Sequence, residues 1–101
     1  MLDREFFLGF IKVHILYHAS KEPVYGVDLA KELARHGYQL SPGTLYPTHH
    51  RLEKEGYLQS STSVINGKVR KYYTITSKGG KALSQAKKKI GELVKEVIEE
   101  K

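Results

Sequence analysis

The sequence predicts a mostly helical α+β fold in which three helices precede a two-stranded hairpin and one long helix, the order of a winged helix-turn-helix. Three observations predict it. Apolar residues recur at helical spacing from Leu2 to Lys54, an Asn66-Gly67 turn lies between two strand-like segments, and a second helical pattern occupies the remainder of the chain. A chain of 101 residues has room for one hydrophobic core, so these elements must share it.

The composition favours a partner that is rich in phosphate. Lys and Arg outnumber Asp and Glu by 17 to 11, which gives a net charge of +6, and this balance favours nucleic acid first and an anionic membrane second. The chain contains no Cys, which excludes disulfides and Cys-ligated zinc and is typical of a cytoplasmic protein. The apolar run at 6–11 is interrupted by Lys12, well short of the roughly 20 residues of a membrane span, so we expect no membrane association.

The first predicted helix runs from Leu2 to about Ala19. Its apolar residues cover more than one narrow stripe, so the helix needs two neighbours: they are Phe7, Phe10, Ile11, Val13, Leu16 and Tyr17. The segment from Ser20 to Pro23 interrupts the pattern. A second helix is predicted from about Gly26 to Gly37, with Leu29, Ala30 and Leu33 facing inward.

A third helix is predicted to begin at Pro42 and to end at Gly56. Ser41 is a favoured N-cap residue, Pro42 suits the first helical position, and Leu40 can pack on Leu45 as a hydrophobic staple. With Leu45 and Leu52 buried, a projection at about 100° per residue gives an outward face that is basic and polar, made of Pro47, His50, Arg51 and Lys54. Pro47 lacks an N–H, so we expect it to bend or loosen the first turns.

Two strands follow, about Tyr57 to Ile65 and Lys68 to Thr76. Asn66-Gly67 favours a type I′ turn between them because both residues tolerate positive φ. A two-residue turn fixes the register, and it pairs Leu58 with Ile75, Ser60 with Tyr73 and Val64 with Val69 on one face, and Ser61 with Tyr72 and Ser63 with Arg70 on the other. The tip of the hairpin carries Lys68, Arg70 and Lys71, whose clustering favours contact with phosphate over simple protection of an edge strand.

The last predicted helix runs from Thr76 to about Glu100. Its apolar residues recur at three- and four-residue steps, the pattern of a helix seam, and so short a chain cannot cover the whole helix by itself. We therefore predict a homodimer, although the same stripe can also pack on the first helix. The expected dimer contacts are Phe6, Phe10, Leu83, Ala86, Ile90, Leu93, Val94 and Val97.

Together these elements predict binding to double-stranded DNA. A helix of the third helix's length fits the major groove, and its N-terminus offers backbone N–H groups to a phosphate. We expect residues 1–76 to form the DNA-binding domain and residues 77–101 a dimerisation helix packed on it. The expected DNA contacts are Tyr25, Ser41, Thr44, Tyr46, Pro47, His50, Arg51, Lys54, Lys68, Arg70 and Lys71.

Several motifs also carry a family resemblance. They are Tyr25-Gly26, LSPGTLYP at 40–47, RLEKEGYL at 51–58, and GKVRKYYTIT at 67–76 followed by Gly79 and Leu83. The chain resembles the PadR family of bacterial and archaeal transcriptional regulators over most of its length. The resemblance implies a winged helix-turn-helix, usually a repressor, that dimerises through its C-terminal helix. The single short C-terminal helix is similar to that of the small subgroup, some of whose members bind flat hydrophobic compounds at the dimer interface.

The sequence departs from the family pattern in two places. Position 49 is commonly Leu in the family and is His49 here, for which we expect a buried ring hydrogen-bonded to backbone in preference to a pH switch. The chain also has no Trp, the residue that a drug-binding member of the small subgroup stacks on its ligand. Phe6, Phe10 and the aliphatic seam remain to line a cleft for a small hydrophobic effector.

The sequence also allows other functions to be weighed against DNA binding. A winged-helix module that docks a protein is the main alternative, and a shallow dependence of affinity on salt would distinguish it from DNA binding. His14 and His18 have a spacing that can share a metal ion, but packed or surface histidines are the favoured interpretation and we expect no cofactor or metal. The residues 87–89 are favoured as a solvated helix face. No catalytic motif is found, so we do not expect an enzyme.

Overall fold

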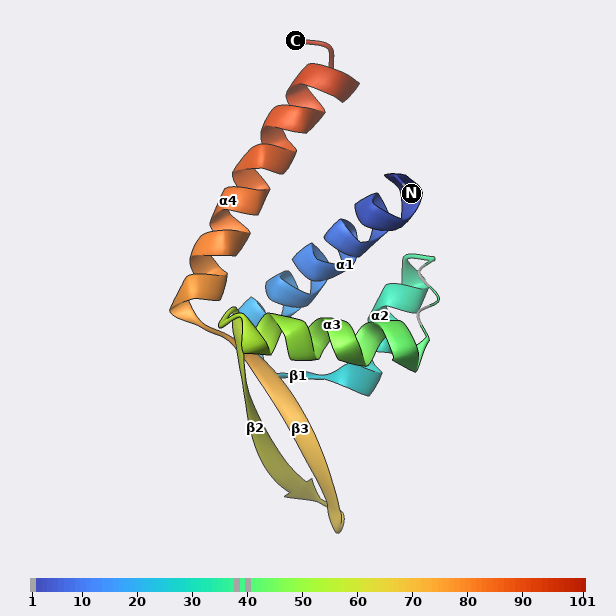
Figure 1. The fold of residues 1–101 in the computed structure, drawn as a ribbon, viewed down its shortest axis with the longest axis vertical. Helices are drawn as coiled ribbons and strands as arrows, with labels where there is room; N and C mark the ends of the chain where they lie inside the picture. Colours follow the sequence, from blue (N-terminus) through green and yellow to red (C-terminus); the bar gives the residue numbers. More distant parts are fainter. Residues whose placement is uncertain (1, 38, 40) are drawn as a thin grey trace.

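The computed structural model describes residues 2–37, 39 and 41–101, and Figure 1 shows their arrangement. The predicted order of three helices, a hairpin and a long helix is confirmed. In Figure 1 the hairpin and α4 leave the helical body in opposite directions. In chain order the elements are α1 (Leu2–Lys21), β1 (Val24–Tyr25), α2 (Gly26–Arg35), α3 (Pro42–Lys54), β2 (Leu58–Ile65), β3 (Lys68–Ile75), α4 (Ser77–Leu93) and the π-helical turn η1 (Val94–Ile98).

The hydrophobic core lies where α1, α2, α3 and the base of the sheet meet. Its fully buried aliphatic side chains come from four different elements: Ile11, Ile15, Leu33, Leu45 and Leu58. Ile11 and Ile15 lie four positions apart on α1, so this helix turns one face into the core. The other face of α1, which carries Phe6, remains exposed.

The hairpin has the predicted register. Leu58 pairs with Ile75 and Val64 with Val69, and Asn66 and Gly67 have φ values of 52° and 77°, as a type I′ turn requires. The sequence did not predict β1, which pairs antiparallel with β3 and makes a three-stranded sheet of order β1-β3-β2. Two residues are too few to show an alternating pattern, so only the fold reveals this strand.

The helix ends largely follow the predicted signals. α3 begins at Pro42 and gives way at Gly56, whose φ is +88°, while the proposed staple from Leu40 lies outside the described residues. α1 continues through Ser20 to Lys21, two residues beyond the expected end. The prediction of one regular C-terminal helix was wrong over its last turn, because α4 ends at Leu93 and a π-helical turn follows.

Candidate nucleic-acid interface

The outward face of α3 is polar and cationic. Leu45 and Leu52 are 2% and 4% exposed, and their burial fixes the rotation of the helix. The opposite side is exposed along its whole length and consists of Tyr46, Pro47, His50, Arg51 and Lys54. Within the described part of the chain, neither Arg51 nor Lys54 forms an ion pair. α3 therefore presents uncompensated positive charge to the solvent.

The start of α3 differs from the expected capped helix. Ser41 occupies the N-cap position with extended backbone (φ −72°, ψ 154°), but its hydroxyl makes no capping hydrogen bond and lies 3.4 Å from that of Thr44. The Ser41 side chain therefore does not compete with an external anion for the backbone N–H groups of the first turn.

α3 remains continuous through Pro47, so the loosening that we expected there is not a break in the helix. The hydroxyl of Thr48 donates a hydrogen bond to the carbonyl of Thr44 at 2.7 Å. This side-chain bond spans the turn that contains Pro47, whose missing N–H removes a bond from the helix. The turn thus gains a hydrogen bond where the backbone loses one.

His49 is the one fully buried histidine of α3. Nδ1 lies 3.0 Å from the carbonyl oxygen of Leu45 and donates to it, and the ring lies 4.9 Å from the ring of Tyr73 in the sheet. Nε2 is the one buried side-chain polar atom without a hydrogen-bond partner among the described residues. Burial lowers the pKa of His49, and the bond to Leu45 opposes this effect. The expectation of a buried ring bonded to backbone is confirmed.

The two helices of the helix-turn-helix meet at a glycine. Gly26 is the first residue of α2, and a Cβ atom at that position would lie 3.2 Å from the ring of Tyr46. The ring therefore packs directly on the start of α2, while Tyr46 remains 49% exposed. This contact orients Tyr46 along the surface of the molecule.

The cationic residues of the hairpin divide between its two faces. Alternation along a strand places Lys71 on the same face as Val69 and the buried Tyr73, and places Lys68 and Arg70 on the other face. The three cations predicted at the hairpin tip therefore do not share one face, because adjacent strand residues point in opposite directions.

Lys71 is engaged within the protein. Its ammonium lies 3.2 Å from the carboxylate of Glu53 on α3, and that carboxylate also accepts a hydrogen bond from Ser60 on β2. The bond from Ser60, with Lys71 beside it, lowers the pKa of Glu53. Glu53 therefore links α3 to both strands of the hairpin and neutralises one of the hairpin's charges.

Arg70 is held by aromatic side chains on the other face of the hairpin. Its guanidinium lies 4.8 Å from the centre of the Tyr25 ring, and Tyr25 lies 5.7 Å from Tyr72, its cross-strand partner. A guanidinium over an aromatic face keeps its charge and its donors. Tyr25, a candidate DNA contact, thus supports a second candidate contact.

Sequence reasoning missed Lys12. A hollow of about 200 Å³ between α1 and α3 is lined by Lys12 together with Thr44, Pro47 and Arg51. In the sequence Lys12 was noted only as an interruption of an apolar run, and that interruption was the available signal. The structure brings its charge beside the outward face of α3.

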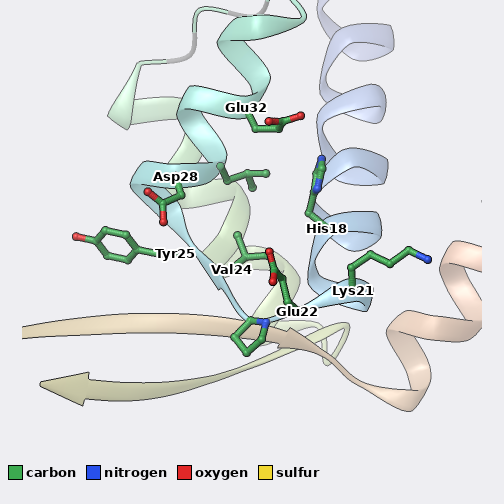
Figure 2. A pocket seen from close by; sticks show the side chains of 9 residues that line it. His18, Lys21, Glu22, Val24, Tyr25, Asp28 and Glu32 are labelled. Atoms are coloured by element: carbon green, nitrogen blue, oxygen red, sulfur yellow. The ribbon is translucent and has the colours of Figure 1, made fainter. Parts of the chain in front are cut away.

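Acidic residues gather in a pocket beside Tyr25. This pocket has a volume of about 290 Å³ and lies between the end of α1, β1 and α2. Figure 2 shows that three carboxylates line it together with Tyr25, His18 and Lys21. The carboxylates belong to Glu22, Asp28 and Glu32. Three negative groups disfavour phosphate, and this acidic pocket borders the candidate interface at Tyr25, the residue that supports Arg70.

Most of the exposed apolar residues lie on α1, α4 and η1, while Val64 and Val69 near the tip of the hairpin are each 70% exposed. Phe6 is 55% exposed, Leu93 49% and Val97 62%, and the rings of Phe6 and Phe10 meet edge to face at 4.8 Å. Leu83, one of the predicted seam residues, is only 5% exposed and belongs to the core of its own chain. The remaining predicted seam residues are partly or fully exposed: Phe10, Ala86, Ile90 and Val94.

A groove of about 590 Å³ lies between α1, α2 and α4, lined by aromatic and aliphatic residues including Phe10, Tyr17 and Ile90. Its polar wall contains His14, which lies 5.2 Å from the ring of His36. Burial, and then the neighbouring histidines, lower the pKa of His14.

Among the described residues, no group of three or more His, Asp or Glu is placed to hold a metal ion. No described helix is both long and apolar enough to cross a bilayer.

The sequence and the fold are similar to those of known regulators. The pattern of the Transcriptional regulator PadR-like family matches residues 15–85. Transcriptional regulator Rv3488 of Mycobacterium tuberculosis is 46% identical over 95 residues, which are 94% of this chain and 89% of that protein.

Two solved structures have closely similar folds. A PadR family transcriptional regulator from Eggerthella lenta superposes with a TM-score of 0.82 at 34% identity, over 97% of this chain and 87% of that one. A PadR-like transcriptional regulator from Bacillus cereus superposes with a TM-score of 0.81 at 35% identity, over 90% of each chain.

Proposed function

Since the chain belongs to the PadR-like family of transcriptional regulators, we propose that it is a repressor that binds specific sequences in double-stranded DNA as a homodimer. Its family is one of DNA-binding regulators and not of enzymes. The outward face of α3 is the main support for sequence-specific DNA binding. Arg51 and Lys54 are exposed there, and neither forms an ion pair within the described chain. We expect the protein to act in the cytoplasm, beside the chromosome.

In this proposal α3 reads base edges in the major groove. Arg51 offers the planar pair of donors that suits guanine, and His50 and Lys54 reach bases or phosphates. Ser41 and Thr44 stand at the helix N-terminus, where backbone N–H groups favour a phosphate. Lys68 and Arg70 bind the phosphates beside the hairpin of β2 and β3, which is the wing of the fold. Lys71 contributes less to phosphate binding, because Glu53 already neutralises its charge.

The homodimer would form through α1, α4 and η1. Exposed apolar side chains on one surface favour an interface, and Phe6, Ile90 and Val97 lie on these elements. Two copies would then read two half-sites about one helical turn, or roughly 10 base pairs, apart. The groove beside Phe10 and Tyr17 is the place that we propose for a small hydrophobic effector.

Binding to DNA is tested first by its dependence on salt. An operator can be selected from random double-stranded DNA, and its affinity measured between about 50 and 200 mM salt. Contact with several phosphates predicts a linear fall of log affinity with log salt, with a slope of about −0.9 per phosphate. A shallow slope with no selected sequence would favour the alternative, a winged-helix module that docks a protein.

Arg51→Ala tests the reading helix. If Arg51 contacts a base, its loss weakens binding by about 1 to 3 kcal/mol and relaxes the sequence preference at one position. The matched control is Arg35→Ala, which removes an exposed Arg that is paired with Glu32 on α2 and should leave the preference unchanged. Unaltered affinity in Arg51→Ala would remove this residue from the DNA-reading set.

A further inference from the structure

The first turn of α4 is bonded to the end of α3. Three successive carbonyls at that end, those of Glu55, Gly56 and Tyr57, accept hydrogen bonds from two residues. The hydroxyl of Thr76 donates to Gly56 at 2.6 Å, and the Thr76 N–H donates to Tyr57 at 3.2 Å. The Lys78 ammonium donates to Glu55 at 2.7 Å. The Lys78 ammonium also lies 4.7 Å from the centre of the Tyr57 ring. We call this set of contacts the α3–α4 junction.

A glycine lets the two segments come this close. A Cβ atom at Gly79 would lie 2.1 Å from the carbonyl oxygen of Tyr57 and 2.7 Å from the Ile75 side chain. The Gly79 N–H donates to the Thr76 hydroxyl at 3.0 Å, so the hydroxyl that caps α4 is the one that binds Gly56. The next residue, Gly80, has open space around the same position, and glycine is therefore required at 79 and not at 80.

We infer that the α3–α4 junction sets the distance between the two half-sites that the protein recognises. The inference rests on the proposed function, a homodimer that pairs through α4. In such a dimer the junction is a direct hydrogen-bonded connection between the helix that reads DNA and the helix that pairs the subunits, beside the packing of α4 on α1. Thr76, Lys78 and Gly79 are thus positioning residues, which act on DNA through α3.

The length of the last helix makes the angle at the junction important. At a rise of about 1.5 Å per residue, α4 and η1 together are roughly 33 Å long, and Figure 1 shows them extending away from the body. A tilt of about 10° at the junction would displace the far end by roughly 6 Å, whereas one base pair rises about 3.4 Å. A small change at the junction therefore alters the preferred spacing by more than one base pair.

The test is a selection from palindromic DNA in which the spacer between fixed half-sites varies in length. The half-sites are those that the wild-type protein selects. Gly79→Ala and Thr76→Val should each shift or broaden the preferred spacing by at least one base pair while keeping the same bases within each half-site. Gly80→Ala adds the same methyl group in open space, and Thr76→Ser keeps the hydroxyl, so both should keep the wild-type spacing.

The outcomes separate this inference from the proposed function. If the wild-type protein selects no paired half-sites, the proposed function fails. If it does, and folded dimeric Gly79→Ala and Thr76→Val keep its spacing, the inference alone is overturned. Should Gly79→Ala fail to fold, Thr76→Val and Lys78→Met decide the question, because neither introduces a clash and Lys78 is exposed.

Discussion

At the scale of single residues, His49 is the least expected feature of the body. A buried polar atom without a partner costs about 1 to 3 kcal/mol, and Nε2 of His49 is such an atom. Nδ1 is satisfied by the Leu45 carbonyl, so half of the ring is bonded and half is not. The residue therefore links the stability of α3 to the protonation of one imidazole.

His49 should make the protein less stable in acid. Its pKa is lowered in the folded state, so the unfolded chain, with a His pKa of about 6.5, takes up a proton that the folded chain does not. The free energy of unfolding is then highest above about pH 6.5 and falls below it, with a limiting slope of about 1.4 kcal/mol per pH unit. Denaturant titrations between pH 5 and pH 8 measure this dependence.

His49→Leu isolates the contribution of this ring from that of His14, whose pKa is also lowered. We expect the variant to be about 1 kcal/mol more stable than the wild type at pH 8, because the partnerless nitrogen is removed, and by more at pH 5. His50→Leu, at the exposed neighbouring position, is the control for placing a leucine on α3. Parallel curves for the wild type and His49→Leu would contradict this account.

At the scale of elements, local signals predicted what local interactions determine. The register of the hairpin follows from Asn66-Gly67 alone, and the burial of Leu45 and Leu52 follows from helical periodicity. The sequence did not reveal β1, because its pairing with β3 depends on how α1 and α2 place two residues. The pairing of Lys71 with Glu53 was missed for the same reason: it joins two elements across the fold.

The wing offers a prediction about charge. Lys68→Gln should reduce the magnitude of the salt slope of DNA binding by about 0.9, the effect of one lost phosphate contact. Lys71→Gln should change the slope less, because the Glu53 carboxylate already neutralises this ammonium in the free protein. The two variants remove the same charge three residues apart, so each controls for the other. Equal changes in slope would show that Lys71 leaves Glu53 for the DNA.

At the scale of the whole molecule, the shape leaves part of the apolar surface uncovered. The described chain measures 54 × 29 × 21 Å, and its length comes from the hairpin at one end and from α4 and η1 at the other (Figure 1). Leu83 near the start of α4 is buried in the core, whereas Leu93, Val97 and Ile98 are 49%, 62% and 72% exposed. Burial thus ends where the chain's own body ends, and the apolar pattern continues past it.

Ile90→Asp tests whether a second copy covers this surface. Ile90 is 38% exposed and lines the groove beside Phe10, so in a dimer through α4 the substitution buries an unpaired charge in each subunit. Such burial costs several kcal/mol per ion, and the two ions of a dimer raise the dissociation constant by at least about a thousandfold. Sedimentation of the variant should therefore show a monomer at concentrations where the wild type is dimeric.

Gln85→Asp is the control, because it adds the same charge at another exposed position of α4. A helical projection at about 100° per residue places Gln85 on nearly the opposite side of α4 from Ile90. Gln85→Asp should remain dimeric, and this contrast separates a seam on one face from a general effect of charge.

The monomeric Ile90→Asp should also lose most of its affinity for paired half-sites while retaining weak binding to one half-site, because two linked reading helices bind far more tightly than one. A dimeric Ile90→Asp would place the subunit contact away from Ile90.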